Sequence, residues 1–119
     1  TETCGSPSFL QKDSLMKKMI AGLLALGMGL ANAADPVAGK TKAATACAVC
    51  HGPMGMAMQP GVPNLAGQQE MYLIEQLKLY RNGKRHNEVM GVIAKPLTDQ
   101  EIDNLALWYS SLNVTVSEK

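Results

Sequence analysis

Two cysteines and a histidine stand together in the segment Cys47-Ala48-Val49-Cys50-His51. The two thiols are three positions apart, so one turn of helix brings both to one side, where they can add to the two vinyl groups along one edge of a haem. The adjacent imidazole then projects under the ring, where it can bind the iron. This spacing predicts one covalently attached haem c with His51 as an axial ligand.

Two other chemistries use closely spaced cysteines. A thioredoxin-type redox pair shares the C-x-x-C spacing, but it belongs to a βαβ setting that this sequence lacks. A zinc site could combine the same three residues with His86. Adjacent Cys and His ligands followed by a long gap do not match the spacing of structural zinc sites. Haem attachment is therefore the favoured prediction, with these two as alternatives.

The composition is consistent with a small domain built around a cofactor. A chain of 119 residues allows one domain. Aromatic residues make up only 4% of the chain, so something other than rings must fill the centre. The formal net charge is +1 and no run of like charges occurs, which argues against nucleic acid as a partner.

The first third of the chain has the features of a targeting segment. Residues 19–34 carry no charge, follow Lys17 and Lys18, and end near the small-x-small triplet at positions 31–33, as in a secretory signal peptide. This run is shorter than the roughly 20 residues needed to span a bilayer. We predict an upstream extension outside the fold over 1–15, a signal peptide over 16–33 and the folded domain over 34–119.

The elements that must position the cysteines and the histidine are expected to be helices. Asp35 is an N-cap candidate followed by proline, and it predicts a first helix that runs to about Val49. An apolar stripe at helical spacing predicts a second helix over about 69–82, with Gly83 as its left-handed terminator. No segment reads as a strand, so the predicted fold class is all-α.

A third predicted helix has the strongest start signal. Thr98 and Glu101 form a capping box, and apolar residues follow at helical spacing as far as Tyr109. The first helix carries very small residues on one face, among them Gly39 and Ala43, which would let another helix approach closely.

The segment 52–67 between the first two helices is too rich in glycine and proline for regular structure. A structureless loop of this length is unusual in a small domain unless it wraps a ligand. We expect it to wrap the haem.

Several segments in this order resemble the class I c-type cytochromes, and within them the small single-haem bacterial branch of cytochrome c-four and c-five-five-three type. The resemblance rests on C-x-x-C-H, Gly61-Val62-Pro63-Asn64-Leu65-Ala66-Gly67-Gln68, Leu79-Tyr80-Arg81-Asn82-Gly83-Lys84-Arg85, Met90, and the segment from Pro96 to Tyr109. It implies the class I cytochrome c fold, with three main helices and loops wrapped around one covalently attached haem.

The resemblance also implies roles for single residues. The first and last helices are expected to cross at Gly39 against Tyr109. Pro63 corresponds to the residue whose carbonyl accepts the other ring N–H of the axial histidine, here His51, which fixes the tautomer and orientation of the ring. Met90 corresponds to the second axial ligand of the iron.

The remaining methionines and the second histidine are weaker ligand candidates. Met54, Met56 and Met58 follow His51 too closely to reach the opposite face of the haem, so we expect them to pack in the loop, and Met71 to pack on the second helix. His86 is the alternative to Met90 as the second axial ligand, but the basic and polar neighbours of His86 suggest that it lies on a solvated surface.

The resemblance implies a periplasmic electron carrier and not an enzyme. Expected partners are redox proteins such as a membrane-bound oxidase, a reductase or a cytochrome complex. Two alternatives stay open, a fixed electron-transfer subunit of a larger enzyme, and a haem enzyme or gas sensor with an open sixth site. A basic cluster at 78–85 and an acidic one at 99–103 are either ordinary solvated helix ends, which is the favoured interpretation, or the poles of a dipolar domain that steers a partner.

Overall fold

The computed structural model describes residues 32–118 of the chain. The predicted extension over 1–15, and all of the predicted signal peptide except its last two residues, lie outside this part. The described residues form five helices and no strand, which confirms the all-α prediction. The helices are α2 (Pro36–Ala46), α3 (Ala48–His51), α4 (Glu70–Arg81), α5 (Glu88–Ala94) and α6 (Asp99–Ser110). No helix in the described part is long and apolar enough to cross a bilayer.

The predicted helix starts are confirmed by their hydrogen bonds. The Asp35 carboxylate accepts from the backbone N–H of Val37 at 2.8 Å. At the start of α6, both halves of the capping box between Thr98 and Glu101 are present. The second predicted helix matches α4 to within one residue at each end.

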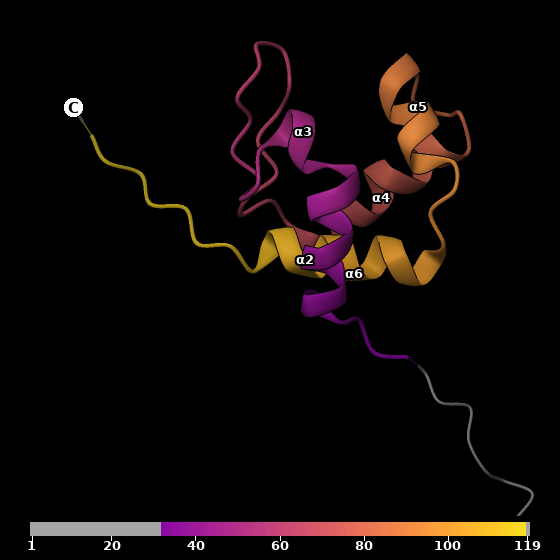
Figure 1. The fold of residues 1–119 in the computed structure, drawn as a ribbon, viewed down its shortest axis with the longest axis horizontal. Coiled ribbons are helices and arrows are strands. Elements are labelled where there is room, and N and C mark those ends of the chain that lie inside the picture. The colour runs from indigo at the N-terminus through magenta and orange to yellow at the C-terminus, as the bar shows by residue number, and fades with distance from the viewer. Residues whose placement is uncertain (1–31, 119) are drawn as a thin grey trace, which may run out of the picture. The chain divides into compact units, whose positions relative to one another are not determined.

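The first predicted helix is interrupted where the cysteines begin. Cys47 has φ −116, far from the helical value of about −63, and it separates α2 from the single turn of α3. The backbone N–H of His51 then donates to the carbonyl of Cys47 at 2.9 Å. The prediction of one continuous helix to Val49 was therefore wrong, and the break lets α3 leave the axis of α2 (Figure 1).

Helices α2 and α6 cross in close contact (Figure 1). Gly39 is buried at the crossing, and a Cβ added there would lie 2.0 Å from the carbonyl oxygen of Asn104 and 2.9 Å from Cβ of Trp108. The expected partner Tyr109 lies elsewhere, with its ring against Gly55 of the 52–67 loop. The expected pairing of Gly39 with Tyr109 was thus wrong, because the neighbouring Trp108 faces α2.

The core is small and centred on α6. Two of its side chains, Ile102 and Leu105, are the largest fully buried ones among the described residues. Buried residues from α2, α4, α5 and the α5–α6 connection pack around them, namely Ala43, Leu73, Ala94 and Leu97.

The basic cluster at 78–85 and the acidic cluster at 99–103 meet at one ion pair. Arg81 at the end of α4 pairs with Asp99 at the start of α6, with Nη2 and Oδ1 2.6 Å apart. Its Nη1 donates to the carbonyl of Leu97 at 2.9 Å. Glu101 pairs with Lys42 of α2 at 2.9 Å. One pair of the charges expected to form a dipole therefore neutralises itself locally, and the dipole itself stays a prediction.

The α2–α6 crossing gives the first testable prediction. Helix propensity alone would make Gly39→Ala stabilising. Because the added methyl group would meet backbone atoms of Asn104, we expect it instead to lower the free energy of unfolding by about 1–3 kcal/mol. Denaturant unfolding of the haem-loaded protein measures the change.

The exposed neighbour Ala38 provides the matched control. Ala38→Gly removes a methyl group from α2 without touching the crossing, and should cost about 1 kcal/mol or less through helix propensity. If the free energy of unfolding of Gly39→Ala equals or exceeds that of the unmutated protein, the close helix crossing is not the reason for glycine at position 39.

Candidate functional site

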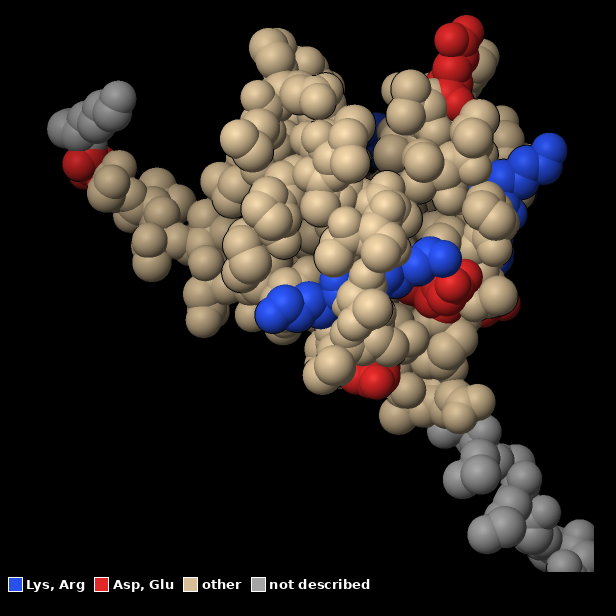
Figure 2. Space-filling view, in the orientation of Figure 1, with Lys and Arg blue, Asp and Glu red and all other residues tan. Residues whose placement is uncertain are grey.

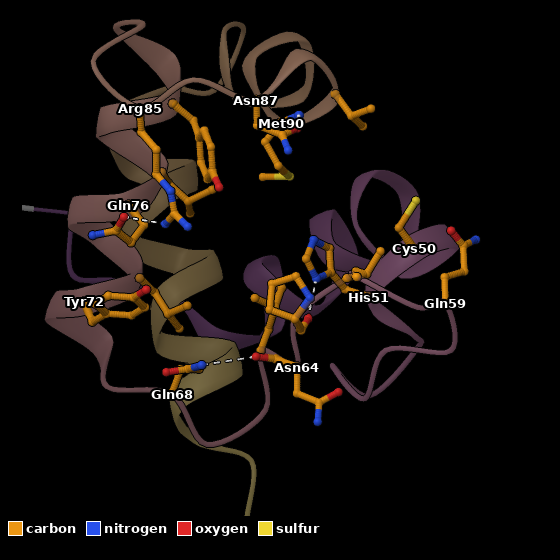
Figure 3. A pocket seen from close by; sticks show the side chains of 18 residues that line it. Cys50, His51, Gln59, Asn64, Gln68, Tyr72, Gln76, Arg85, Asn87 and Met90 are labelled. Carbon is orange, nitrogen blue, oxygen red and sulfur yellow. Dashed lines mark hydrogen bonds between the residues drawn. The ribbon is translucent and has the colours of Figure 1, made fainter.

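A cavity of about 590 Å³ lies between α3 with the loop that follows it and the pair α4 and α5 (Figure 3). Its volume falls within the range of about 300–1,000 Å³ that is usual for cofactor sites. Most of the lining surface is apolar, although polar side chains also contribute to it, among them His51, Gln76 and Asn87.

His51 stands at the end of α3 and is only 7% exposed. Its ring Nδ1 lies 2.9 Å from the carbonyl oxygen of Pro63, the contact that the sequence led us to expect. With the proton on Nδ1 donated to that oxygen, Nε2 keeps its lone pair free for a metal. The chain therefore holds this imidazole in the tautomer that binds iron.

The 52–67 loop is folded so that Pro63 can reach His51. Gly52 has φ +80, and a Cβ there would lie 2.0 Å from the backbone oxygen of Met56, so only glycine fits this turn. The carbonyl of Gly55 accepts from the N–H groups of Leu65 and Ala66, at 2.7 and 3.1 Å. These bonds bring the second half of the loop back beside α3.

The two cysteines differ in their surroundings. Cys50 lines the cavity, whereas Cys47 packs against the hydrophobic core. Burial raises the pKa of the Cys47 thiol, and the neighbouring Tyr109 hydroxyl opposes that rise. The two cysteines form no disulfide with each other.

Met90 lies in the first turn of α5 and lines the cavity. Figure 3 shows its side chain and the His51 ring pointing toward one another across the open space. Asn87 caps α5, and its side-chain oxygen accepts from the backbone N–H of Met90 at 2.9 Å. A thioether and an imidazole thus face each other from two separate parts of the chain.

The other ligand candidates lie away from this space. His86 is exposed and does not line the cavity, as expected for a solvated residue. Met54, Met56 and Met58 are also absent from its lining, but all three are exposed, Met58 at 81%, so the prediction that they pack in the loop was wrong. Met71 is 75% exposed on the outer face of α4, so the prediction that it packs was wrong.

The sequence analysis did not predict two features of the site. Helix α5 has only seven residues, too few to show a helical period, although Asn87 followed by Glu88 is a recognisable start signal. Arg85 also lines the cavity, where the sequence suggested only a surface cation.

The residues present fit a haem. An imidazole with a free Nε2 and a thioether sulfur face each other across an apolar cavity, and Cys50 stands at its edge. These side chains supply the imidazole and thioether pair found in cytochromes c and one of the two thiols of the C-x-x-C-H pattern, while the second thiol, Cys47, packs beside the core one turn away. The described part of the chain contains no cluster of three or more His, Cys, Asp or Glu residues that could hold a separate metal ion.

Comparison with known proteins agrees with this fit. The cytochrome c family model matches residues 36–113. Cytochrome c4 of Thiocapsa roseopersicina is 46% identical over 77 residues, which are 65% of this chain and 40% of that protein. Cytochrome c-554(548) of Halomonas halodenitrificans is 40% identical over 82 residues, covering 66% of this chain and 98% of that protein.

A solved structure, the thiosulfate dehydrogenase of Marichromatium purpuratum, matches with a TM-score of 0.63 and 32% identity, over 74% of this chain and 21% of that one. The chain spans half or less of the length of the first cytochrome c4 relatives it matches. The family match nevertheless covers all five helices of the described residues. This chain therefore belongs to the cytochrome c family, and its Cys47-x-x-Cys50-His51 pattern identifies one covalently attached haem c as its cofactor.

Proposed function

We propose that this chain is a one-electron carrier with His51 and Met90 as the axial ligands of its haem iron. The observation that carries the proposal is that these two side chains face one another across one apolar cavity. The haem supplies a one-electron change between ferrous and ferric iron. With both axial positions filled, no site is left for a substrate, which favours a carrier over an enzyme or a gas sensor.

The chain's own residues would hold and orient the cofactor. Cys47 and Cys50 would form the thioether bonds, and the carbonyl of Pro63 would keep His51 in its iron-binding tautomer. Asn87 would hold the first turn of α5, and with it Met90, in place. The apolar lining would exclude water and, together with a thioether ligand, would favour the ferrous state.

The location and the partners belong to the same proposal. Residues 16–33 would act as a signal peptide for export to the periplasm, with 34–119 as the cytochrome c domain. Oxidases, reductases and cytochrome complexes of the membrane are the expected redox partners.

The surface over α3 and the 52–67 loop is free of charged side chains in Figure 2, and no Asp, Glu, Lys or Arg occurs between Lys42 and Glu70.

A fixed electron-transfer subunit is the second candidate function. It is favoured by the similarity to the thiosulfate dehydrogenase structure, which covers 74% of this chain. Co-purification from the native organism distinguishes the two cases. A carrier should elute alone, whereas a fixed subunit should elute with a larger redox enzyme.

Covalent attachment gives the first prediction for this function. If Cys47 and Cys50 carry the haem, it should remain with the chain through acid-acetone extraction. The variant with Cys47→Ala and Cys50→Ala should yield little folded protein, because so small a domain lacks an alternative centre. Quantitative extraction of haem from the unmutated protein would contradict covalent attachment.

The axial methionine gives a second prediction. A thioether is a soft ligand that prefers ferrous iron, so Met90→Ala should lower the reduction potential. We expect the equilibrium constant for reduction to fall by about tenfold or more, which equals about 59 mV for one electron. Carbon monoxide should bind readily to the variant but poorly to the unmutated ferrous protein at neutral pH.

Met71→Ala is the matched control, because Met71 is exposed on α4 and lies outside the cavity. It should change neither the potential nor carbon monoxide binding. Avid carbon monoxide binding by the unmutated protein would instead indicate an open sixth site, and would favour the enzyme or sensor alternative.

A further inference from the structure

Three methionines, Met54, Met56 and Met58, occupy alternate positions of the loop that follows α3. All three side chains are exposed, at 51%, 47% and 81%. Methionine is usually a buried residue, and the same loop does bury another apolar side chain, because Leu65 packs against the core. Packing therefore does not explain why three thioethers stand in solvent within five residues.

The backbone that carries these methionines is held in place by hydrogen bonds. The backbone N–H of Gly55 donates to the carbonyl of Gly52 at 3.1 Å, which closes a turn around the first methionine. The backbone N–H of Ala57 donates to the side-chain oxygen of Asn64 at 2.8 Å, which fixes the stretch between the other two. Gathering the three side chains around one ligand would thus cost mainly side-chain entropy.

The three sulfur atoms are within reach of a common point. Met54 and Met56 line one shared cavity of about 350 Å³ between the loop and the segment that follows α6. Met58 comes two residues after Met56, and Cα atoms at that separation are at most about 7 Å apart. A methionine side chain is unbranched and flexible, so exposed thioethers at these positions can converge.

The donor set selects a soft cation. Thioether sulfur is a neutral, soft ligand that suits Cu(I), whereas imidazole suits Zn²⁺ and Cu²⁺ and carboxylates suit Mg²⁺ and Ca²⁺. Residues 52–69 contain no His, Cys, Asp or Glu, and no Lys or Arg that would repel a cation. The face over this loop is uncharged in Figure 2. These donors therefore favour a soft monovalent ion over the common divalent metals.

An exposed apolar surface can also mark a protein-docking face. That role needs only apolar area, which leucine or valine supplies equally well. This loop instead has methionine at all three positions, and only Gly55 and Ala57 stand between them. No bulky side chain is therefore interposed between the sulfur atoms in the sequence, as a shared ligand would require.

We propose that Met54, Met56 and Met58 form a surface site that binds one Cu(I) ion through three thioether sulfurs. None of the three lines the haem cavity, so this site is separate from the one that holds the haem. The ion binds and leaves as Cu(I), without electron transfer. The inference goes beyond the proposed function and does not depend on the axial ligands of the iron.

The experiment is anaerobic equilibrium dialysis of the ferrous, haem-loaded full chain against Cu(I) kept in solution by acetonitrile. It compares the unmutated protein with the triple variant Met54→Leu, Met56→Leu and Met58→Leu. Leucine keeps the size and the apolar character of the surface but removes the donors. We expect the triple variant to bind one equivalent of copper less, and each single replacement to weaken binding at least about tenfold.

Met71→Leu is the matched control, because Met71 is a 75% exposed thioether on α4. It should bind as much copper as the unmutated protein. Sulfur groups outside the described residues are the same in all these proteins, so they do not affect the difference. Zn²⁺ should bind equally to the unmutated protein and the triple variant. A zinc equivalent lost in the triple variant would contradict the assignment of a soft-metal site.

A direct readout locates the ion without any variant. In the ferrous unmutated protein, the methyl NMR signals of Met54, Met56 and Met58 should shift on addition of Cu(I), while the haem absorption spectrum stays unchanged. Equal copper binding by the unmutated protein and the triple variant, or a changed haem spectrum without shifts at the three methyl groups, would overturn the proposal. The loop would then be left as an apolar docking face. Avid carbon monoxide binding would contradict the proposed carrier but not the copper site.

Discussion

The close crossing of α2 and α6 is the constraint on which the rest of the structure depends. Gly39 lets the backbones approach until its Cα meets the carbonyl of Asn104, and no larger residue fits that space. Helix α2 leads directly into α3, and α6 carries the largest fully buried side chains. The crossing therefore connects the cysteine segment to the core. Tyr109, one residue beyond the contact at Trp108, links that core to Cys47 and to Gly55 of the loop.

The loop after His51 shows how a segment without regular structure can be held in one conformation. Its turns need glycine at Gly52 and Gly55, and its halves are joined by hydrogen bonds to the carbonyl of Gly55. The backbone N–H of Gly67 donates to the carbonyl of Tyr109 at 2.9 Å, which fastens the far end of the loop to α6. The orientation of His51 thus depends, through Pro63, on the same core as the helix crossing.

Local signals in the sequence were sufficient for part of this fold. The capping box at Thr98 and the N-cap at Asp35 act within a few residues, so they could be identified without knowing what packs nearby. Contacts that depend on tertiary packing could not be identified from such local signals. Whether Trp108 or Tyr109 meets Gly39 is decided by the rotation of α6 about its axis, and the position of Arg85 beside the cavity depends on a reversal of the chain after α4.

The two sides of the cavity are anchored unequally. His51 is buried and tied to Pro63 within a loop that is fastened to α6. Met90 lies on α5, whose main helical neighbour is α4 and whose only buried residue is Ala94. Helix α4 also has one buried residue, but it packs on α6 as well as on α5, so α5 is held by fewer contacts and should open before α4. Under the proposed ligation, the methionine side is therefore where the coordination of the iron would be most open to adjustment, through the Asn87 cap that holds the first turn of α5.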